Sequence, residues 1–475
     1  MTGVQTCALP ICPVYHSPED LLINCDVDYC AEITKVACGM LVHVDMVPTS
    51  VNELTIRNTG DGESVDLFYN SDISADFSTY KIYLGQVSGT YDQTFETTED
   101  QYTITGLENG TEYFIGVSIA DTDGNESLIT EFSKTVVDMS LDQGILIVDD
   151  AEGGFNDPEE TDIDNFYYTL FNNIDVITTE YDATENGKIP LDQMGAYSTV
   201  LWHINKAMTN NVIHENKEEL KDYLYGGGNL ILTADKPTIS IEHIIYEYPV
   251  TFDEASFTRE WLKIDSTDLD RTARFIGACP AENSEMDSLY ADTLKTENSL
   301  DNHLKDVEAL YASADAQTIY LYDTYFEEGS PYSTMKDMPV GIAYFGDDYN
   351  AVTLSFPLYY IKENQSKRLI INLLEEFGYD TYIPGANKEM SAEYLHVMPN
   401  PVSDITSLKF FNNRISHVDI SLYNISGAIM EKIFSGKCSR GENIITFNAQ
   451  GITPGIYFIR IKSDDFIVNQ KIIIK

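Results

Sequence analysis

The sequence predicts a multidomain protein that combines a parallel α/β domain with β-sandwiches, and three observations support this prediction. A length of 475 residues exceeds one compact core, because a domain averages about 150 residues. Residues 50–138 and 394–475 alternate apolar and polar side chains, which indicates half-buried strands. Residues 143–380 alternate strand-like and helix-like segments, an order typical of a parallel sheet with helices on both faces.

Composition excludes several classes of partner. The chain has 29 Lys and Arg against 77 Asp and Glu, a formal net charge of −48, so we expect it to bind no nucleic acid. No apolar run reaches the ~18 residues of a membrane span, so we expect no transmembrane segment. Seven cysteines, five of them before residue 39, show neither a disulfide framework nor a CxxC zinc spacing.

The first 48 residues contain two different segments. Residues 1–12 (MTGVQTCALPIC) resemble the conceptual translation of a sequencing adapter, and we predict that they are an artefact. Residues 13–48 contain the stretch YHSPED around His16, followed by a helix predicted from Asp28 to Val44 with an apolar stripe. This segment resembles the C-terminal end of a di-zinc aminopeptidase domain, of the class of bacterial leucyl aminopeptidases and glutamate carboxypeptidase relatives.

The resemblance implies that His16 ligates one of two zinc ions in an intact parent, where metal-activated water would hydrolyse the N-terminal bonds of peptide substrates. The remaining ligands and the glutamate base of that family are not in this sequence. We therefore expect a truncated, inactive chain that does not hold zinc stably. The alternative is that His16 is an ordinary surface histidine near a turn.

Residues 50–138 predict a sandwich of short strands with Gly, Asn and Asp turns. The segment LENGTEYFIGVSIADTDGNES, residues 107–127, resembles the later strands of fibronectin type III modules. The resemblance implies that Tyr113 is a corner tyrosine whose hydroxyl bonds back to the backbone. The early half departs from the family, because it has no tryptophan on the second strand.

The α/β domain, residues 143–380, resembles the flavodoxin-like and glutamine-amidotransferase-like accessory domains of secreted bacterial peptidases. Its first strand, residues 144–150 (GILIVDD), ends in two acids, and residues 255–335 read as an insertion of unassigned fold. An amidotransferase needs a cysteine at a sharp strand-to-helix turn, but the candidate turn, residues 233–237, is TADKP. A phosphoryl receiver needs an Asp where this chain has His203. We therefore predict a non-catalytic domain.

Acids near the end of that first strand form one candidate metal site. Carboxylate oxygens are the ligands that calcium prefers, although the spacing here is not that of an EF-hand. Solvation of a polar loop is the alternative. The candidate calcium ligands are Asp149, Asp150, Glu152 and Asp157.

Residues 381–393 are predicted to be a linker, and residues 394–475 form the last β domain. The features of this domain resemble the C-terminal sorting domain of the type IX secretion system. The resemblance implies a small β-sandwich that engages the secretion machinery of a Bacteroidetes-like bacterium, with an extracellular or cell-surface location. The motifs that carry it are MPNP (398–401), YNISG (423–427), TPGIY (453–457) and the C-terminal Lys475.

Together these features predict the C-terminal part of an exported zinc-dependent aminopeptidase-like metallopeptidase, with accessory and sorting domains. The alternative is a non-enzymatic secreted surface protein that binds glycans or proteins.

Overall fold

The structure is a computed structural model, and it describes most of the chain from residue 27 onward. The chain divides into two compact units, residues 1–171 with 176–377 and residues 172–175 with 378–475. The predicted artefact segment, His16 and the whole predicted linker lie outside the described residues. Those described are 27–70, 75–151, 158–171, 174, 176–206, 211–243, 247–282, 284, 286–296, 303–379, 395–412, 416–425, 427–438, 441–463 and 467–475.

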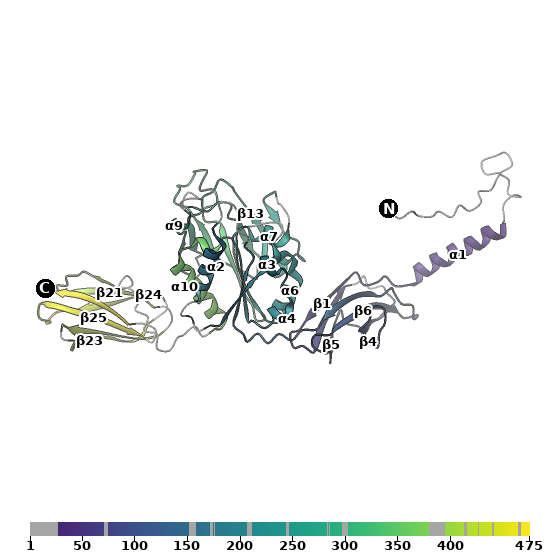
Figure 1. Cartoon of the computed structure of the whole chain (residues 1–475), viewed down its shortest axis with the longest axis horizontal. Coiled ribbons are helices and arrows are strands. Elements are labelled where there is room, and N and C mark those ends of the chain that lie inside the picture. Colours follow the sequence, from purple (N-terminus) through teal and green to yellow (C-terminus); the bar gives the residue numbers. More distant parts are fainter. Residues whose placement is uncertain are drawn as a thin grey trace. The chain divides into compact units, whose positions relative to one another are not determined.

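Helix α1 (Val27–Met46) is the first described element, where the sequence predicted a helix from Asp28 to Val44 (Figure 1). Asp28 lies in its first turn, where a negative charge favours the helix dipole. Its apolar side chains are exposed rather than packed, which is unusual for a stripe at helical spacing.

A β-sandwich follows the helix. Alternate side chains of both sheets fill one apolar core, as in β6, where Ile115 and Val117 are fully buried. The hydroxyl of Tyr113 accepts a hydrogen bond from the backbone N–H of Glu108 at 3.2 Å, as a corner tyrosine does. One sheet has the order β1 (Glu53–Asn58), β2 (Ser64–Asn70), β5 (Gln101–Thr105), and the other β4 (Gln93–Thr97), β3 (Phe77–Gly85), β6 (Glu112–Asp121), β7 (Thr130–Thr135).

The α/β domain has a central sheet with helices on both faces (Figure 1). Five neighbouring strands are parallel, and their order along the sheet differs from their order along the chain. β9 lies outside β8, whereas β10, β11 and β19 follow on the other side of β8. Their bounds, in spatial order, are β9 (Thr178–Asp182), β8 (Ile145–Asp149), β10 (Thr199–Ile204), β11 (Asn229–Ala234) and β19 (Asn350–Leu354).

The prediction of a wholly parallel sheet is wrong for the other half of this sheet. A tight turn after Phe345 joins β18 to β19 as a hairpin, so these strands must run antiparallel. Residues 255–335, which the sequence left unassigned, contribute most of this extension and a small separate sheet. The extension comprises β18 (Pro339–Phe345), β17 (Gln317–Asp323), β14 (Gly277–Pro280) and β15 (Leu289–Tyr290); the small sheet comprises β12 (Val250–Thr251), β13 (Ile264–Asp268) and β16 (Ala309–Ala312).

The predicted helices are present with shifted ends. α2 (Glu160–Leu170) and α10 (Glu363–Glu376) contact each other, and α6 (Lys217–Tyr225) contacts α4 (Leu191–Met194). Gly226 ends α6, with its N–H donating to the carbonyl of Asp222, and Gly227 has a φ of 98°, so the three glycines from 226 to 228 form a helix end and turn. The short helices are α3 (Ala183–Asn186), α5 (Val212–Glu215), α7 (Pro237–Glu242), α8 (Phe257–Glu260), α9 (Thr293–Thr296) and the 3₁₀ turn η2 (Leu358–Tyr360).

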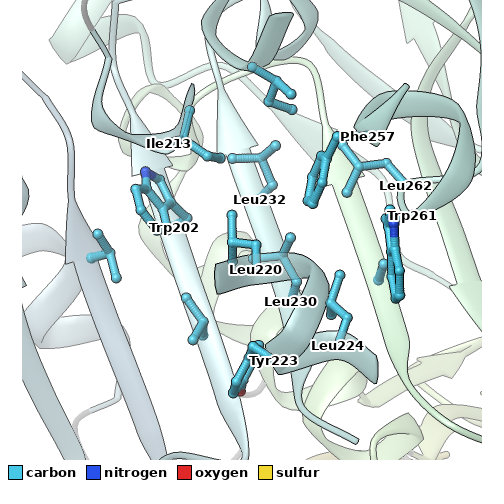
Figure 2. Packing of buried hydrophobic residues seen from close by; sticks show 14 of the residues in the cluster. Trp202, Ile213, Leu220, Tyr223, Leu224, Leu230, Leu232, Phe257, Trp261 and Leu262 are labelled. Atoms are coloured by element: carbon cyan, nitrogen blue, oxygen red, sulfur yellow. The ribbon is translucent and has the colours of Figure 1, made fainter. Parts of the chain in front are cut away.

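Trp202 belongs to the core on one face of this sheet (Figure 2). Leu230 and Leu232 of the neighbouring strand and Leu220 and Leu224 of α6 belong to the same core. All five side chains are fully buried. Successive side chains of a strand point to opposite faces of the sheet. The even-numbered residues of β8, β10 and β11 therefore point into this core, and the odd-numbered residues point to the face covered by α2.

A network of buried charges joins the sandwich to the α/β domain within the first unit. Asp222 of α6 is 2% exposed and lies 3.6 Å from the guanidinium of Arg57 on β1. It also pairs with the ammonium of Lys134 on β7 and accepts a hydrogen bond from the side chain of Asn58 at 3.1 Å. Three donors from two strands therefore converge on one carboxylate of the other domain.

The second unit is a smaller β-sandwich. Val418, Ile420 and Leu422 are fully buried together with Ile459 and Ile461, so the alternation read from the sequence is confirmed. One sheet has the order β20 (Leu395–Met398), β21 (Ile405–Asn412), β24 (Gly441–Asn448), and the other β23 (Ile429–Cys438), β22 (Ser416–Asn424), β25 (Gly455–Ser463), β26 (Ile467–Ile474).

Candidate functional site

The candidate site lies at the carboxyl edge of the parallel strands, between β8 and β10. The connection after β8 runs through α2 to β9 on one side, whereas the chain after β10 continues to β11 on the other. At such a reversal the two connections leave the sheet on opposite faces, and open α/β sheets bind ligands in the resulting crevice. Asp149 ends β8 at this edge, and His203 stands beside it in the register of β10.

Asp149 lies on the α2 face, where other acids surround it. Burial raises the pKa of its carboxyl group to about 8, and the neighbouring charges of Asp164 on α2 and Asp182 at the end of β9 add to the effect. Burial also raises the pKa of Asp164. The two carboxyl groups share a hydrogen bond, so we expect Asp149 to carry the proton at neutral pH.

His203 is 1% exposed and completes this group. Its ring stacks on Tyr167 of α2 at a centroid distance of 3.8 Å, and its Nδ1 atom lies 3.5 Å from Oδ1 of Asp149. Burial lowers the pKa of the imidazole to about 3, so the ring is neutral. Within the described part of the chain, Nδ1 has no hydrogen-bond partner, and neither amide atom of Asn205, two residues further on, has one.

Asp150 follows Asp149 directly but serves the opposite face. Its carboxylate accepts hydrogen bonds from the indole N–H of Trp202 at 3.1 Å and from the backbone N–H groups of Val212 and Ile213 at 3.0 Å each. It therefore holds the first turn of α5 against the end of β8. This is a structural task that leaves few lone pairs for a metal ion.

The calcium hypothesis stays a prediction. Glu152 and Asp157 lie outside the described residues, and Asp149 and Asp150 engage different partners on the two faces of the sheet. Among the residues that the structure describes, no group of three or more His, Cys, Asp or Glu side chains is arranged to hold a metal ion. His16, the predicted zinc ligand, is outside that set.

The turn after β11 has the sharp geometry of a strand-to-helix elbow. Lys236 occupies its apex with φ 47° and ψ 64°, and Pro237 begins α7. The ammonium of Lys236 pairs with the carboxylate of Asp235 at 2.6 Å. The prediction of a non-catalytic domain stays a prediction.

Glu308 is a buried acid that the sequence did not single out. It accepts hydrogen bonds from the N–H and hydroxyl of Thr238 at 3.1 and 2.7 Å and from the hydroxyl of Tyr248 at 2.6 Å. Burial raises the pKa of its carboxyl group. Its three donors anchor α7 below the elbow. Asp164 was also missed, because a lone acid on a helix gives no sequence pattern that points toward a strand end.

The three motifs of the last domain have clear local roles. In the MPNP motif, the amide of Asn400 donates to the carbonyl of Lys471 and accepts from the N–H of Ile473, at 3.1 and 3.0 Å. In the YNISG motif, the side chain of Asn424 accepts from the N–H of Ala428 and closes the hairpin turn. In the TPGIY motif, the hydroxyl of Tyr457 donates to the carbonyl of Thr453 at 2.8 Å.

Comparison with known proteins places the last domain in a family. Residues 396–475 match the family described as the secretion system C-terminal sorting domain. This domain implies export to the cell surface or the extracellular space and a link to the secretion machinery. No helix in the described residues is long and apolar enough to cross a membrane. No curated protein sequence matches the chain.

Solved fibronectin III structures also resemble part of the chain. The FN1–FN3 domains of chicken CNTN1 share 11% identity over 19% of this chain and 32% of their own, with a TM-score of 0.18. An Fn3-like protein from Clostridium thermocellum shares 26% identity over 18% of this chain and 91% of its own, with a TM-score of 0.16. FN3tt shares 22% over 19% and 97%, with a TM-score of 0.18. The sorting domain thus implies that the chain is a secreted protein.

Proposed function

We propose that this chain is the C-terminal part of an exported zinc-dependent aminopeptidase-like metallopeptidase, and that it is inactive by itself. The observation that carries the proposal is the apolar stripe of α1. Ile33, Val36 and Met40 follow one another at helical spacing, and their side chains are 49%, 63% and 65% exposed. A stripe of this kind normally packs against the domain to which the helix belongs. The proposed domain is a peptidase, because the motif around His16 resembles one.

Chemistry supports the inactive state. A co-catalytic zinc pair needs about five protein ligands and a general base, whereas His16 alone supplies one imidazole. In this proposal the fibronectin III-like sandwich and the α/β domain are accessories of the parent enzyme. The sorting domain delivers the whole protein outside the cell.

An activity assay tests this proposal directly. The purified chain, supplied with zinc, should not hydrolyse aminoacyl-nitroanilides, whereas an authentic di-zinc aminopeptidase in the same buffer should. Zinc-dependent hydrolysis by this chain would contradict the expected inactivity. Reading the coding sequence upstream of residue 13 tests the parentage, which requires a series of His, Asp and Glu zinc ligands there. A leader peptide directly ahead of Val14 would refute it.

A second candidate function is the binding of glycans or proteins by a non-enzymatic secreted surface protein. It is favoured by the unpartnered polar atoms of His203 and Asn205 at the carboxyl edge of the sheet. Buried polar groups normally have hydrogen-bond partners, and those without one often mark a place for water or a ligand. Hydroxyl groups of proteins and polyols can supply such hydrogen bonds. The acidic side chains around Asp149 disfavour anionic ligands.

Binding of soluble oligosaccharides by the purified chain, compared with an Asn205→Ala variant, tests the second candidate. Loss of binding in a variant with an unchanged melting temperature would support it. Equal binding by both forms would place any ligand elsewhere.

A further inference from the structure

The sorting domain differs in charge from the rest of the chain. Residues 396–475 contain nine Lys and Arg and six Asp and Glu, whereas the whole chain has a net charge of −48. The sorting domain is therefore weakly basic in an otherwise very acidic protein. A partner that is attracted to positive charge can therefore distinguish this domain from the acidic rest of the chain.

The four-stranded sheet β23–β22–β25–β26 has one face in the core and one in solvent. On the solvent face, Ile429, Tyr423, Phe458 and Lys471 stand directly opposite one another across all four strands. We call the solvent side of this sheet the outer sheet face. Directly opposed side chains on one face lie within contact distance, so the first three of these residues make a continuous apolar row.

Two further isoleucines extend this row. Ile456 and Ile473 are paired across β25 and β26 at the next outward-facing position, and they are 45% and 39% exposed. Phe458 is 37% exposed and Ile429 63%. Exposed apolar side chains are common when they are scattered, but four exposed ones grouped around the half-buried Tyr423 on a small sheet indicate a binding surface.

The other end of the outer sheet face is polar and mainly basic. The guanidinium of Arg460 lies 4.7 Å from the ring centroid of Tyr423, so it borders the apolar row. Lys462 stands opposite Asp419, which also pairs with Lys432 at 2.8 Å. One carboxylate thus faces three cations on this part of the sheet.

We propose that the outer sheet face is the surface by which the secretion machinery recognises this chain, and that its partner is a protein surface with an apolar centre and acidic rim. The proposal rests on the export function of the sorting domain. Desolvated aromatic and aliphatic anchors surrounded by polar groups are the usual arrangement at protein interfaces. An excess of cations around the anchors selects a partner that carries carboxylates.

This charge pattern disfavours the outer sheet face of a second copy as the occupant. Two outer sheet faces would bring their cations together, which repels. An anionic lipid surface shares the required charge but has no fixed apolar pocket for Phe458. The experiments below separate it from a protein partner.

Export of the full chain by a bacterium with a working type IX system tests the proposal. We expect the double variant Ile456→Ser with Phe458→Ser to reduce the exported fraction at least about tenfold, because loss of an aromatic anchor weakens an interface by that order or more. The control is Ile444→Ser on β24, which removes an exposed isoleucine, 59%, from the other sheet. The control should be exported normally.

Two further measurements make the outcome decisive. Melting of the purified variants should show that the sorting domain still folds, because neither replaced side chain belongs to its buried core. A chain without residues 396–475 should not be exported; if that chain is exported, the sorting function itself fails and the proposal falls with it. Normal export of the double variant alongside failure of the shortened chain overturns only the proposal for the outer sheet face.

Binding in vitro identifies the partner. The full chain should bind outer-membrane fractions from a type IX-competent strain more tightly than those from a strain that lacks the system, and added salt should weaken this binding. Arg460→Glu should weaken it as well. Equal binding to protein-free vesicles of anionic lipid would overturn the claim that the partner is a protein.

Discussion

Removing the carboxylate of Asp222 should destabilise the first unit strongly. The side chain of Asp222 is 3% exposed and that of Arg57, its partner across the junction, 9% exposed. The change Asp222→Ala leaves a buried guanidinium without its partner, and the loss of one member of a buried pair costs about 3–5 kcal/mol. Lys134, 17% exposed, loses its partner as well.

Urea unfolding measured by tryptophan fluorescence is a suitable assay for this change. The chain has two tryptophans, and Trp261 lies under Arg57, 5.9 Å from its guanidinium carbon, so it reports on the junction itself. The matched control is Glu218→Ala. Glu218 also contacts Arg57, at 3.3 Å, but its side chain is 62% exposed, so its removal should cost about 0–1 kcal/mol. Equal, small losses for both variants would refute the claim that a buried charge network joins the two domains.

Three other changes test single features. The folded-state pKa of Asp149, about 8, lies above its unfolded value of 3.8. The contribution of this group to the free energy of unfolding is therefore complete below pH 3.8 and is lost as the pH rises toward 8. The loss is at most about 1.4 kcal/mol per pH unit. Asp149→Asn should lack this slope in urea unfolding measured from pH 4 to 8, and an identical slope in both proteins would contradict the shift. Tyr113→Phe removes the acceptor of the Glu108 N–H and should lower the stability of the sandwich by about 1 kcal/mol in thermal unfolding. An unchanged stability would contradict the claim that this hydrogen bond stabilises the sandwich. Trp202→Ala should lower the free energy of unfolding by about 3–5 kcal/mol in thermal unfolding. A loss below about 1 kcal/mol would contradict the full burial of this side chain in the core.

Much of the fold could be predicted because each pattern had a local physical cause. The alternation in residues 418–422 and 457–461 was visible, since a two-sided strand must place every second residue in the core.

The candidate site could be predicted only in part. Asp149 stood out because it ends a buried strand, but the two adjacent acids were treated as one site. Strand alternation sends them to opposite faces, and the sequence does not show which face carries which helix. Asp164 and Glu308 meet their partners only through tertiary packing. The antiparallel half of the sheet was missed because the direction of a strand depends on its partner, and because β14 and β15 have only four and two residues.

The central claim is that this acidic protein is carried out of the cell by its C-terminal sorting domain. The most direct measurement is the amount of the full chain outside the outer membrane in a strain with a working type IX system and in a strain without it. The account predicts external protein in the first strain and retention in the second. Equal external amounts in both strains would contradict it.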